Sequence, residues 1–108
     1  MKFLLIKFLK FILFPFKGIL SSISQEYSEK ELFNTGLILS KQNNLRFKKI
    51  KNLSEVEFSV FSQWGDDGII DWLNYILNFK KKRFVEIGVQ DYYECNTRFI
   101  LKKKIGVA

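Results

Sequence analysis

The chain has 108 residues, enough for one small domain, and its hydrophobic fraction of 47% is sufficient for an apolar core. A single cysteine and the absence of histidine exclude an internal disulfide framework, a Cys/His metal site and histidine-based acid–base catalysis. The formal charge of +7 suits an anionic membrane or ligand, but no nucleic-acid-binding motif accompanies the lysines, so we expect no nucleic-acid partner.

Residues 1–17 are predicted to form a basic helix with a hydrophobic face. Lysines interrupt an otherwise apolar run at Lys2, Lys7, Lys10 and Lys17. On a helical wheel these lysines fall within an arc of about 140°, and phenylalanine, leucine and isoleucine occupy the remaining face. Pro15 is expected to limit the helix, because proline lacks an N–H donor and disfavours helical geometry in the residue before it.

This apolar run is shorter than the roughly 20 residues that a membrane-spanning helix needs. A basic amphipathic helix lying on an anionic membrane surface therefore explains the pattern best. Two alternatives remain. The apolar face could pack on the rest of the protein, or the segment could be a signal peptide, although lysines recur through what would be its apolar core.

Residues 18–53 are predicted to be a linker that contains one short helix. The first part is polar and rich in serine. Ser28 and Glu31 stand at the spacing of a capping box, so a helix is expected from there to about Ser40. The remaining residues are polar and basic, and predict an irregular connection.

Residues 54–108 form the third predicted segment, which opens with a capped helix. Asp66 or Asp67 is placed to act as the N-cap, accepting hydrogen bonds from backbone N–H groups of the first turn. The apolar residues that follow recur at helical spacing and are Ile69, Ile70, Leu73, Ile76 and Leu77. We therefore expect an amphipathic helix over residues 69–77.

A strand, a turn and a second helix are predicted next. Phe84–Ile87 is a short apolar run typical of a buried strand, and Gly88 after it favours a turn. A helix is expected from Thr97 to about Lys103, and residues 105–108 are compatible with the start of another strand, cut short. This order is typical of an open α/β sheet, in which ligands bind at the carboxyl ends of the strands.

The end of the predicted strand supplies candidate ligand-binding groups. Gly88 would let a ligand approach the main chain, and Glu86 could hold a ligand ammonium group. A helix that starts near Asn96 favours an anionic group at its N-terminus. Asp66 and Asp67 would flank the same crevice, which suits a zwitterionic or nucleotide-like cofactor. The alternative is a capped turn without a ligand.

Three further side chains are assigned to packing. Cys95 has no histidine to activate it and is expected to fill space beside a helix start. Trp64 and Trp72 are expected to pack in the core or against a helix.

The ordered motifs of about residues 35–108 resemble the amino-terminal part of the FkbM-like S-adenosylmethionine-dependent methyltransferases. That family shares a pattern like S-Q-x-G-E-D-G, a helix, F-V-E-x-G and S-N-T-R-x-L. The matching segments are Ser62–Gly68, Phe84–Gly88 and Asn96–Phe99, with Asp66 where glutamate is usual.

The resemblance implies an α/β fold: the start of a Rossmann-like class I methyltransferase domain, helix-strand-helix, preceded by a mostly helical segment. It also implies S-adenosylmethionine as the cofactor. The cofactor-binding residues would be Gln63, Asp66, Asp67, Glu86, Gly88, Asn96 and Thr97. Two departures are the loop Gln90–Tyr93, which lacks the further glycines of a G-x-G loop, and the end of the chain where a second strand is expected. No catalytic residue and no metal ligand is therefore assigned.

The implied function is that of a truncated methyltransferase fragment acting on a saccharide or another cell-envelope acceptor. Its implied location is the cytoplasm, or the inner face of the membrane as a peripheral protein. For this chain alone we expect no turnover and at most weak cofactor affinity, because one strand cannot form a sheet. The alternative is a small basic membrane-associated protein without catalysis, anchored by residues 1–17.

Overall fold

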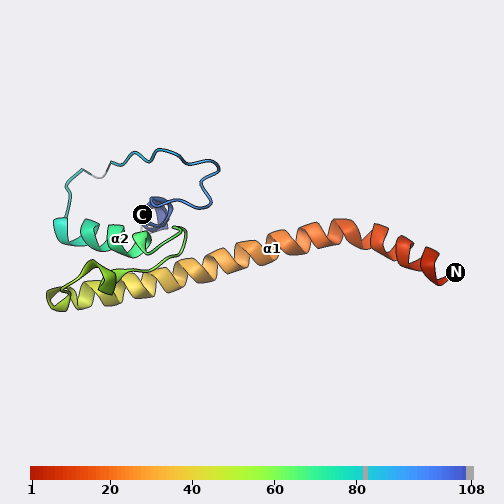
Figure 1. The fold of residues 1–108 in the computed structure, drawn as a ribbon, viewed down its shortest axis with the longest axis horizontal. Coiled ribbons are helices and arrows are strands. Elements are labelled where there is room, and N and C mark those ends of the chain that lie inside the picture. The colour runs from red at the N-terminus through yellow and green to blue at the C-terminus, as the bar shows by residue number, and fades with distance from the viewer. Residues whose placement is uncertain (82, 107–108) are drawn as a thin grey trace. The chain divides into compact units, whose positions relative to one another are not determined.

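The computed structural model describes residues 1–81 and 83–106, in which all regular structure is helical (Figure 1). These residues form the α-helices α1 (Lys2–Leu45), α2 (Asp66–Leu77) and α3 (Arg98–Gly106), and the short 3-10 helices η1 (Phe47–Lys49) and η2 (Leu53–Val56). The chain divides into two compact units, Met1–Glu31 and the residues from Leu32 onward.

Helix α1 continues through the residues for which a linker was expected. Pro15 lies inside it, although proline was predicted to limit the helix. Ser22 donates its hydroxyl hydrogen bond to the carbonyl oxygen of Gly18 at 3.1 Å, and Lys30 pairs with Glu26 one turn earlier at 3.2 Å. Polar side chains are thus satisfied within the helix itself. Residues 18–30, which were expected to be an irregular part of the linker, are helical.

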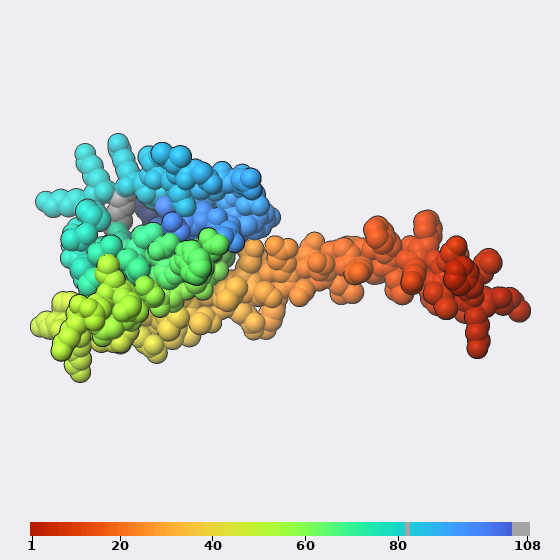
Figure 2. All heavy atoms as spheres, viewed as in Figure 1, coloured from red at the N-terminus to blue at the C-terminus, as the bar shows by residue number. Residues whose placement is uncertain are grey.

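The first unit exposes its apolar side chains. Every residue from Met1 to Ser28 is exposed, and the exposed fraction reaches 81% for Phe11 and 79% for Phe14. Figure 2 shows the side chains of this part of the chain, coloured red to orange, standing out from the helix. Among the described residues, no helix combines the length and the apolar character needed to cross a bilayer.

The second unit has a small aromatic core around Phe99, which is completely buried. The ring centroid of Phe99 lies 5.1 Å from that of Phe58 and 5.7 Å from that of Phe33. A Cβ atom on Gly36 would come within 2.6 Å of the Phe99 ring. Glycine at this position therefore lets the C-terminal part of α1 approach α3 closely enough to close the core.

The helix predicted over residues 69–77 is confirmed as α2, which begins at Asp66. Asn78 ends it in the left-handed conformation with φ 43°, which asparagine tolerates better than most residues. At the other end, the N–H of Gly68 donates to the carbonyl oxygen of Phe58 at 3.1 Å. The second predicted helix, from Thr97 to about Lys103, is confirmed as α3.

The predicted strand at Phe84–Ile87 is wrong, and so is the α/β fold class. Within residues 1–81 and 83–106 there is no strand at all, and Val85 and Ile87 are 89% and 93% exposed. A strand is stabilised by hydrogen bonds to a neighbouring strand, and the described residues supply none. Residues 84–87 have a composition that favours a strand, but no neighbouring strand is present among the described residues to pair with them. The fold of the described residues is therefore all-helical instead of Rossmann-like.

The packing predicted for Cys95 is confirmed, and the predictions for Trp64 and for residues 105 and 106 are corrected. Cys95 is 5% exposed beside the start of α3, as expected of a space-filling residue, whereas Trp64 is 72% exposed and does not pack in the core. Of the strand expected at residues 105–108, residues 105 and 106 belong to α3. Residues 107 and 108 lie outside the described part of the chain.

Candidate functional site

Asp67 fixes the loop that precedes α2. Its Oδ2 atom accepts backbone N–H hydrogen bonds from Val60 at 2.7 Å, Phe61 at 2.7 Å and Ser62 at 2.9 Å. The N–H of Asp67 in turn donates to the Ser62 hydroxyl oxygen at 3.1 Å. The side chain is 1% exposed. Asp67 is therefore committed to the backbone of its own loop.

The same loop contacts the segment that leads into α3. The N–H of Cys95 donates to the carbonyl oxygen of Phe61 at 3.2 Å. The guanidinium carbon of Arg98 lies 4.2 Å from the centroid of the Phe61 ring, within the range of a cation–π interaction. The residue just before Ser62–Gly68 is thus in direct contact with the segment Asn96–Phe99 and with the residue before that segment.

Glu86 caps the N-terminus of α3. Its Oε1 atom accepts the N–H of Asn96 at 2.8 Å, and its Oε2 atom accepts the N–H of Thr97 at 3.0 Å and the Thr97 hydroxyl at 2.5 Å. The hydroxyls of Tyr92 and Thr97 lie 3.0 Å apart and extend this network. The carboxylate provides acceptors for N–H groups that have no partner within a helix.

The electrostatics of Glu86 agree with this capping role. Desolvation raises the pKa of its carboxyl group, but the hydrogen bonds from Thr97 and from the Asn96 backbone outweigh it, and the pKa lies below the ordinary value of 4.5. The ionised form is therefore the one that the fold favours.

The other predicted site residues take no part in this network. Gln63 is exposed, Asp66 is half-buried, and Gly88 is exposed in a left-handed conformation with φ +89° and open space around it. The structure thus brings Glu86, Asn96 and Thr97 together and leaves Gln63 and Gly88 apart in solvent.

Two of the residues predicted to bind S-adenosylmethionine are engaged by contacts within the protein itself. Glu86 was expected to hold a ligand ammonium group, but its oxygens bind the start of α3. Asp67 was expected to flank the crevice, but it is buried and bound to three backbone amides. The two acidic groups stabilise loops, and no step of a methyl transfer can be derived from them.

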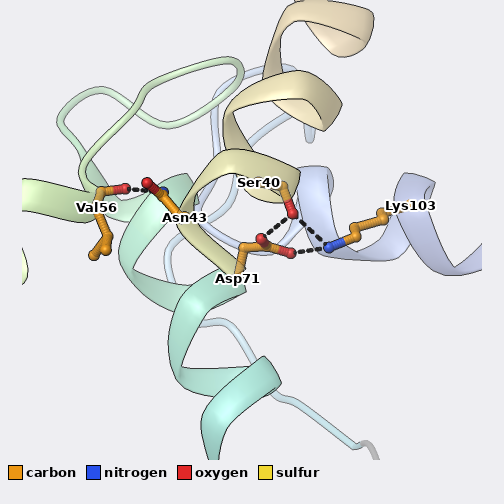
Figure 3. Close-up of polar contacts among 5 residues, drawn as sticks. All are labelled: Ser40, Asn43, Val56, Asp71 and Lys103. Carbon is orange, nitrogen blue, oxygen red and sulfur yellow. Dashed lines mark hydrogen bonds and ion pairs between the residues drawn. The ribbon is translucent and has the colours of Figure 1, made fainter. Parts of the chain in front are cut away.

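A buried polar cluster that the sequence did not reveal joins all three α-helices of the second unit. It consists of Ser40 on α1, Asp71 on α2 and Lys103 on α3 (Figure 3). The Lys103 ammonium lies 2.5 Å from Asp71 Oδ1 and 2.7 Å from Ser40 Oγ, and Ser40 donates to Asp71 Oδ2 at 2.5 Å. Ser40 and Asp71 are 2% and 1% exposed.

The chemistry of this cluster is that of a clamp. The Lys103 ammonium contacts both Asp71 and Ser40, and the Ser40 hydroxyl donates to Asp71, so all three polar groups are engaged with one another. The hydroxyl is also shielded from solvent. One signal in the sequence could have found the cluster, because Asp71 lies one turn after Asp67 on the side of α2 that carries Gly68, which is the buried side.

A second set of contacts ties the end of α1 to η2. The side-chain amide of Asn43 donates to the carbonyl oxygen of Val56 at 3.1 Å (Figure 3), and Arg46 donates to Asn43 Oδ1 at 2.9 Å. At the start of η2, Glu55 accepts backbone hydrogen bonds from Asn52 and Lys51, which hold the pKa of its carboxyl group below the ordinary value.

No family model, no curated protein and no solved structure matches this chain. No group of three or more His, Cys, Asp or Glu residues in the described part of the chain is arranged to hold a metal ion.

Proposed function

We propose that the protein attaches to an anionic membrane surface through the first part of α1. The observation that carries this proposal is the unbroken helical run of exposed apolar side chains interspersed with Lys2, Lys7, Lys10 and Lys17. Proteins rarely leave a contiguous apolar surface of this kind facing water unless it binds a membrane or a partner. The lysines distinguish a membrane with anionic headgroups from an uncharged apolar partner.

The distribution of side chains around α1 refines the mode of binding. Phe3, Ile6, Leu13 and Phe14 have helical angles that fall between those of Lys2 and Lys7, so apolar groups also occupy the lysine side. Lysine stems can lie along these groups while their ammonium groups reach the headgroups. A helix lying in the interfacial plane satisfies both kinds of side chain.

Co-sedimentation of the full chain with vesicles tests this proposal. Vesicles with a quarter anionic phosphatidylglycerol are compared with purely zwitterionic ones. We expect the quadruple variant Lys2→Gln, Lys7→Gln, Lys10→Gln, Lys17→Gln to lose binding by about fivefold for each lysine removed, since one basic residue near an anionic surface contributes about 1 kcal/mol.

The matched control removes the same number of charges from elsewhere in the chain. It is the variant Lys41→Gln, Lys48→Gln, Lys49→Gln, Lys51→Gln, in which all four positions are exposed. If the two variants bind equally well, net charge alone explains the attraction and α1 has no special role. If no vesicle binds the unchanged protein, the proposal is wrong.

A second function is proposed for the residues from Leu32 onward: a contribution to a methyltransferase that uses S-adenosylmethionine and acts on a saccharide or other cell-envelope acceptor. It rests on the resemblance and on one observation. Glu86 in one motif segment binds Thr97 in another, and Arg98 of that second segment lies over the ring of Phe61, the residue just before Ser62–Gly68. Calorimetric titration with S-adenosylmethionine is expected to show at most weak binding, and tight stoichiometric binding would contradict the capping assignment of Glu86.

A further inference from the structure

We propose that the groove between α2 and α3 binds a medium-chain fatty acid, with its aliphatic chain on the groove floor and its carboxylate at the rim. The floor comes from Leu73 and Leu77 on α2, Ile100 and Leu101 on α3, and Phe84 in the connection between the helices. The groove has a volume of about 860 Å³. That volume is in the range of sites that bury most of a small ligand, which is roughly 300–1,000 Å³.

The floor provides the reason for an aliphatic ligand. Leu77 and Phe84 both line the groove, and although both are apolar they are 56% and 48% exposed. A hydrocarbon chain laid on them would remove apolar surface from water on both partners, which is the dominant favourable contribution to such binding.

The rim provides the reason for an anionic head. Lys81, Arg83 and Lys104 line it together with Lys103, and the described residues that line the groove include no aspartate or glutamate. The charge of Lys103 is already balanced by Asp71. The other three leave the rim positive, and the planar fork of Arg83 suits a carboxylate.

The same charges argue against a second copy of this chain in the groove. A symmetric contact would place two basic rims against each other, within a protein that already carries a formal charge of +7. A single anionic amphiphile satisfies floor and rim at once.

Calorimetric titration of the full chain with decanoate below its micellar concentration tests the proposal. The rim variant Lys81→Glu, Arg83→Glu is compared with Lys48→Glu, Lys49→Glu, which changes the net charge equally at exposed positions outside the groove. We expect the rim variant to weaken decanoate binding by roughly fivefold or more, because each exposed ion pair contributes up to about 1 kcal/mol. The control is expected to bind like the unchanged protein.

A second pair of variants separates the groove from the exposed apolar helix of the first unit. Leu77→Asp places a charge on the floor, and Ile19→Asp places one at a position of similar exposure, 57%, on the apolar helix of the first unit. Decanoate binding is expected to weaken at least tenfold only in Leu77→Asp, since an apolar contact is replaced by a like charge. Circular dichroism is used to check that both variants keep their helices.

Four outcomes would overturn the proposal. They are the absence of saturable binding, equal weakening by both members of either variant pair, equal affinity for decyltrimethylammonium, and tighter binding of decyl phosphate than of decanoate. A concentration-dependent dimer that Leu77→Asp abolishes would assign the groove to a second copy instead.

Discussion

Asp67 and Glu86 each bind backbone N–H groups that no strand or helix would otherwise satisfy. The carboxylate of Asp67 organises residues 60–62, and that of Glu86 organises residues 96 and 97. An ionised acceptor makes stronger hydrogen bonds than a neutral one, so each acidic side chain holds a loop that has little other structure.

Removing the Asp67 carboxylate should destabilise the second unit. We expect Asp67→Ala to lower the free energy of unfolding by about 3 kcal/mol, because three amide donors lose a charged acceptor. Urea denaturation followed by circular dichroism measures the change. The control Asp66→Ala, at the half-buried neighbouring position, should cost less than about 1 kcal/mol, which is the contribution of a charge near a helix N-terminus. Equal losses would refute the structural role of Asp67.

Glu86 should make stability depend on acid. Its pKa is lowered in the folded state, so its contribution is complete above the ordinary value of 4.5 and is lost as the pH falls through the lower folded value. We therefore expect the stability difference between the unchanged protein and Glu86→Gln to shrink on acidification from about pH 6 to below that value. Glu55, whose pKa is also lowered, is present in both proteins, so its contribution to the pH dependence cancels in the difference between them. A pH-independent difference would show that the cap does not depend on charge.

The polar cluster of Ser40, Asp71 and Lys103 joins the three α-helices of the second unit, in addition to the apolar core around Phe99. Asp71 is 1% exposed, whereas the Lys103 side chain keeps 29% of its exposure. Removal of the lysine therefore leaves the more deeply buried charge without its partner, which is the costly half of a broken ion pair.

Lys103→Met should lower the free energy of unfolding by about 3 kcal/mol. The double variant Asp71→Leu, Lys103→Met should lose less than Lys103→Met alone, because no buried charge is left unpaired. Urea denaturation of the single and double variants, with Lys104→Met as the neighbouring control, measures this. A double variant less stable than the single one would show that the ion pair itself stabilises the fold.

Periodic apolar residues made α2 predictable, and the helix expected from Thr97 to about Lys103 corresponds to α3. The continuity of α1 was not predictable from local signals, because Pro15 and the serines disfavour a helix that in fact extends over 44 residues. The strand at Phe84–Ile87 failed for the opposite reason: its composition favours a strand, but pairing depends on residues elsewhere. The contact between Asp71 and Lys103 spans 32 residues, which a local pattern cannot encode.

Of the candidate site, the sequence placed Glu86, Asn96 and Thr97 in one location, and the structure does bring them together. What the sequence could not show was the direction of the carboxylate, which points to the start of α3 instead of toward a ligand. Backbone amides at a helix N-terminus attract any nearby anion, and here the nearest anion is the chain's own side chain.

Net positive charge and exposed apolar side chains are concentrated in the first part of the chain. Lys2, Lys7, Lys10 and Lys17 lie among a continuous set of exposed apolar side chains in the first part of α1, within a protein of formal charge +7. Binding to an anionic membrane therefore combines an electrostatic attraction, which salt screens, with apolar insertion, which salt does not weaken.

Vesicle binding should accordingly fall, but not vanish, as salt rises from about 0.05 to 0.5 M, where the screening length shortens well below 10 Å. The apparent affinity is measured by co-sedimentation at each salt concentration. The variant without the four lysines should show a much flatter dependence. An affinity that disappears completely at high salt would mean that the apolar side chains do not insert.

The unpaired run Arg83–Ile87 has a consequence for the protein in solution. Val85 and Ile87, both β-branched and almost fully exposed, flank Glu86 in a segment without regular structure. Such a segment is a template for cross-β stacking between copies, in which identical side chains align. The carboxylate of Glu86 opposes that stacking by repulsion. Protonation of Glu86 at acidic pH would weaken its hydrogen bonds to the start of α3 and would also remove the repulsion between Glu86 carboxylates of stacked copies. Fibril formation should therefore begin at the same acidic pH at which α3 loses its cap.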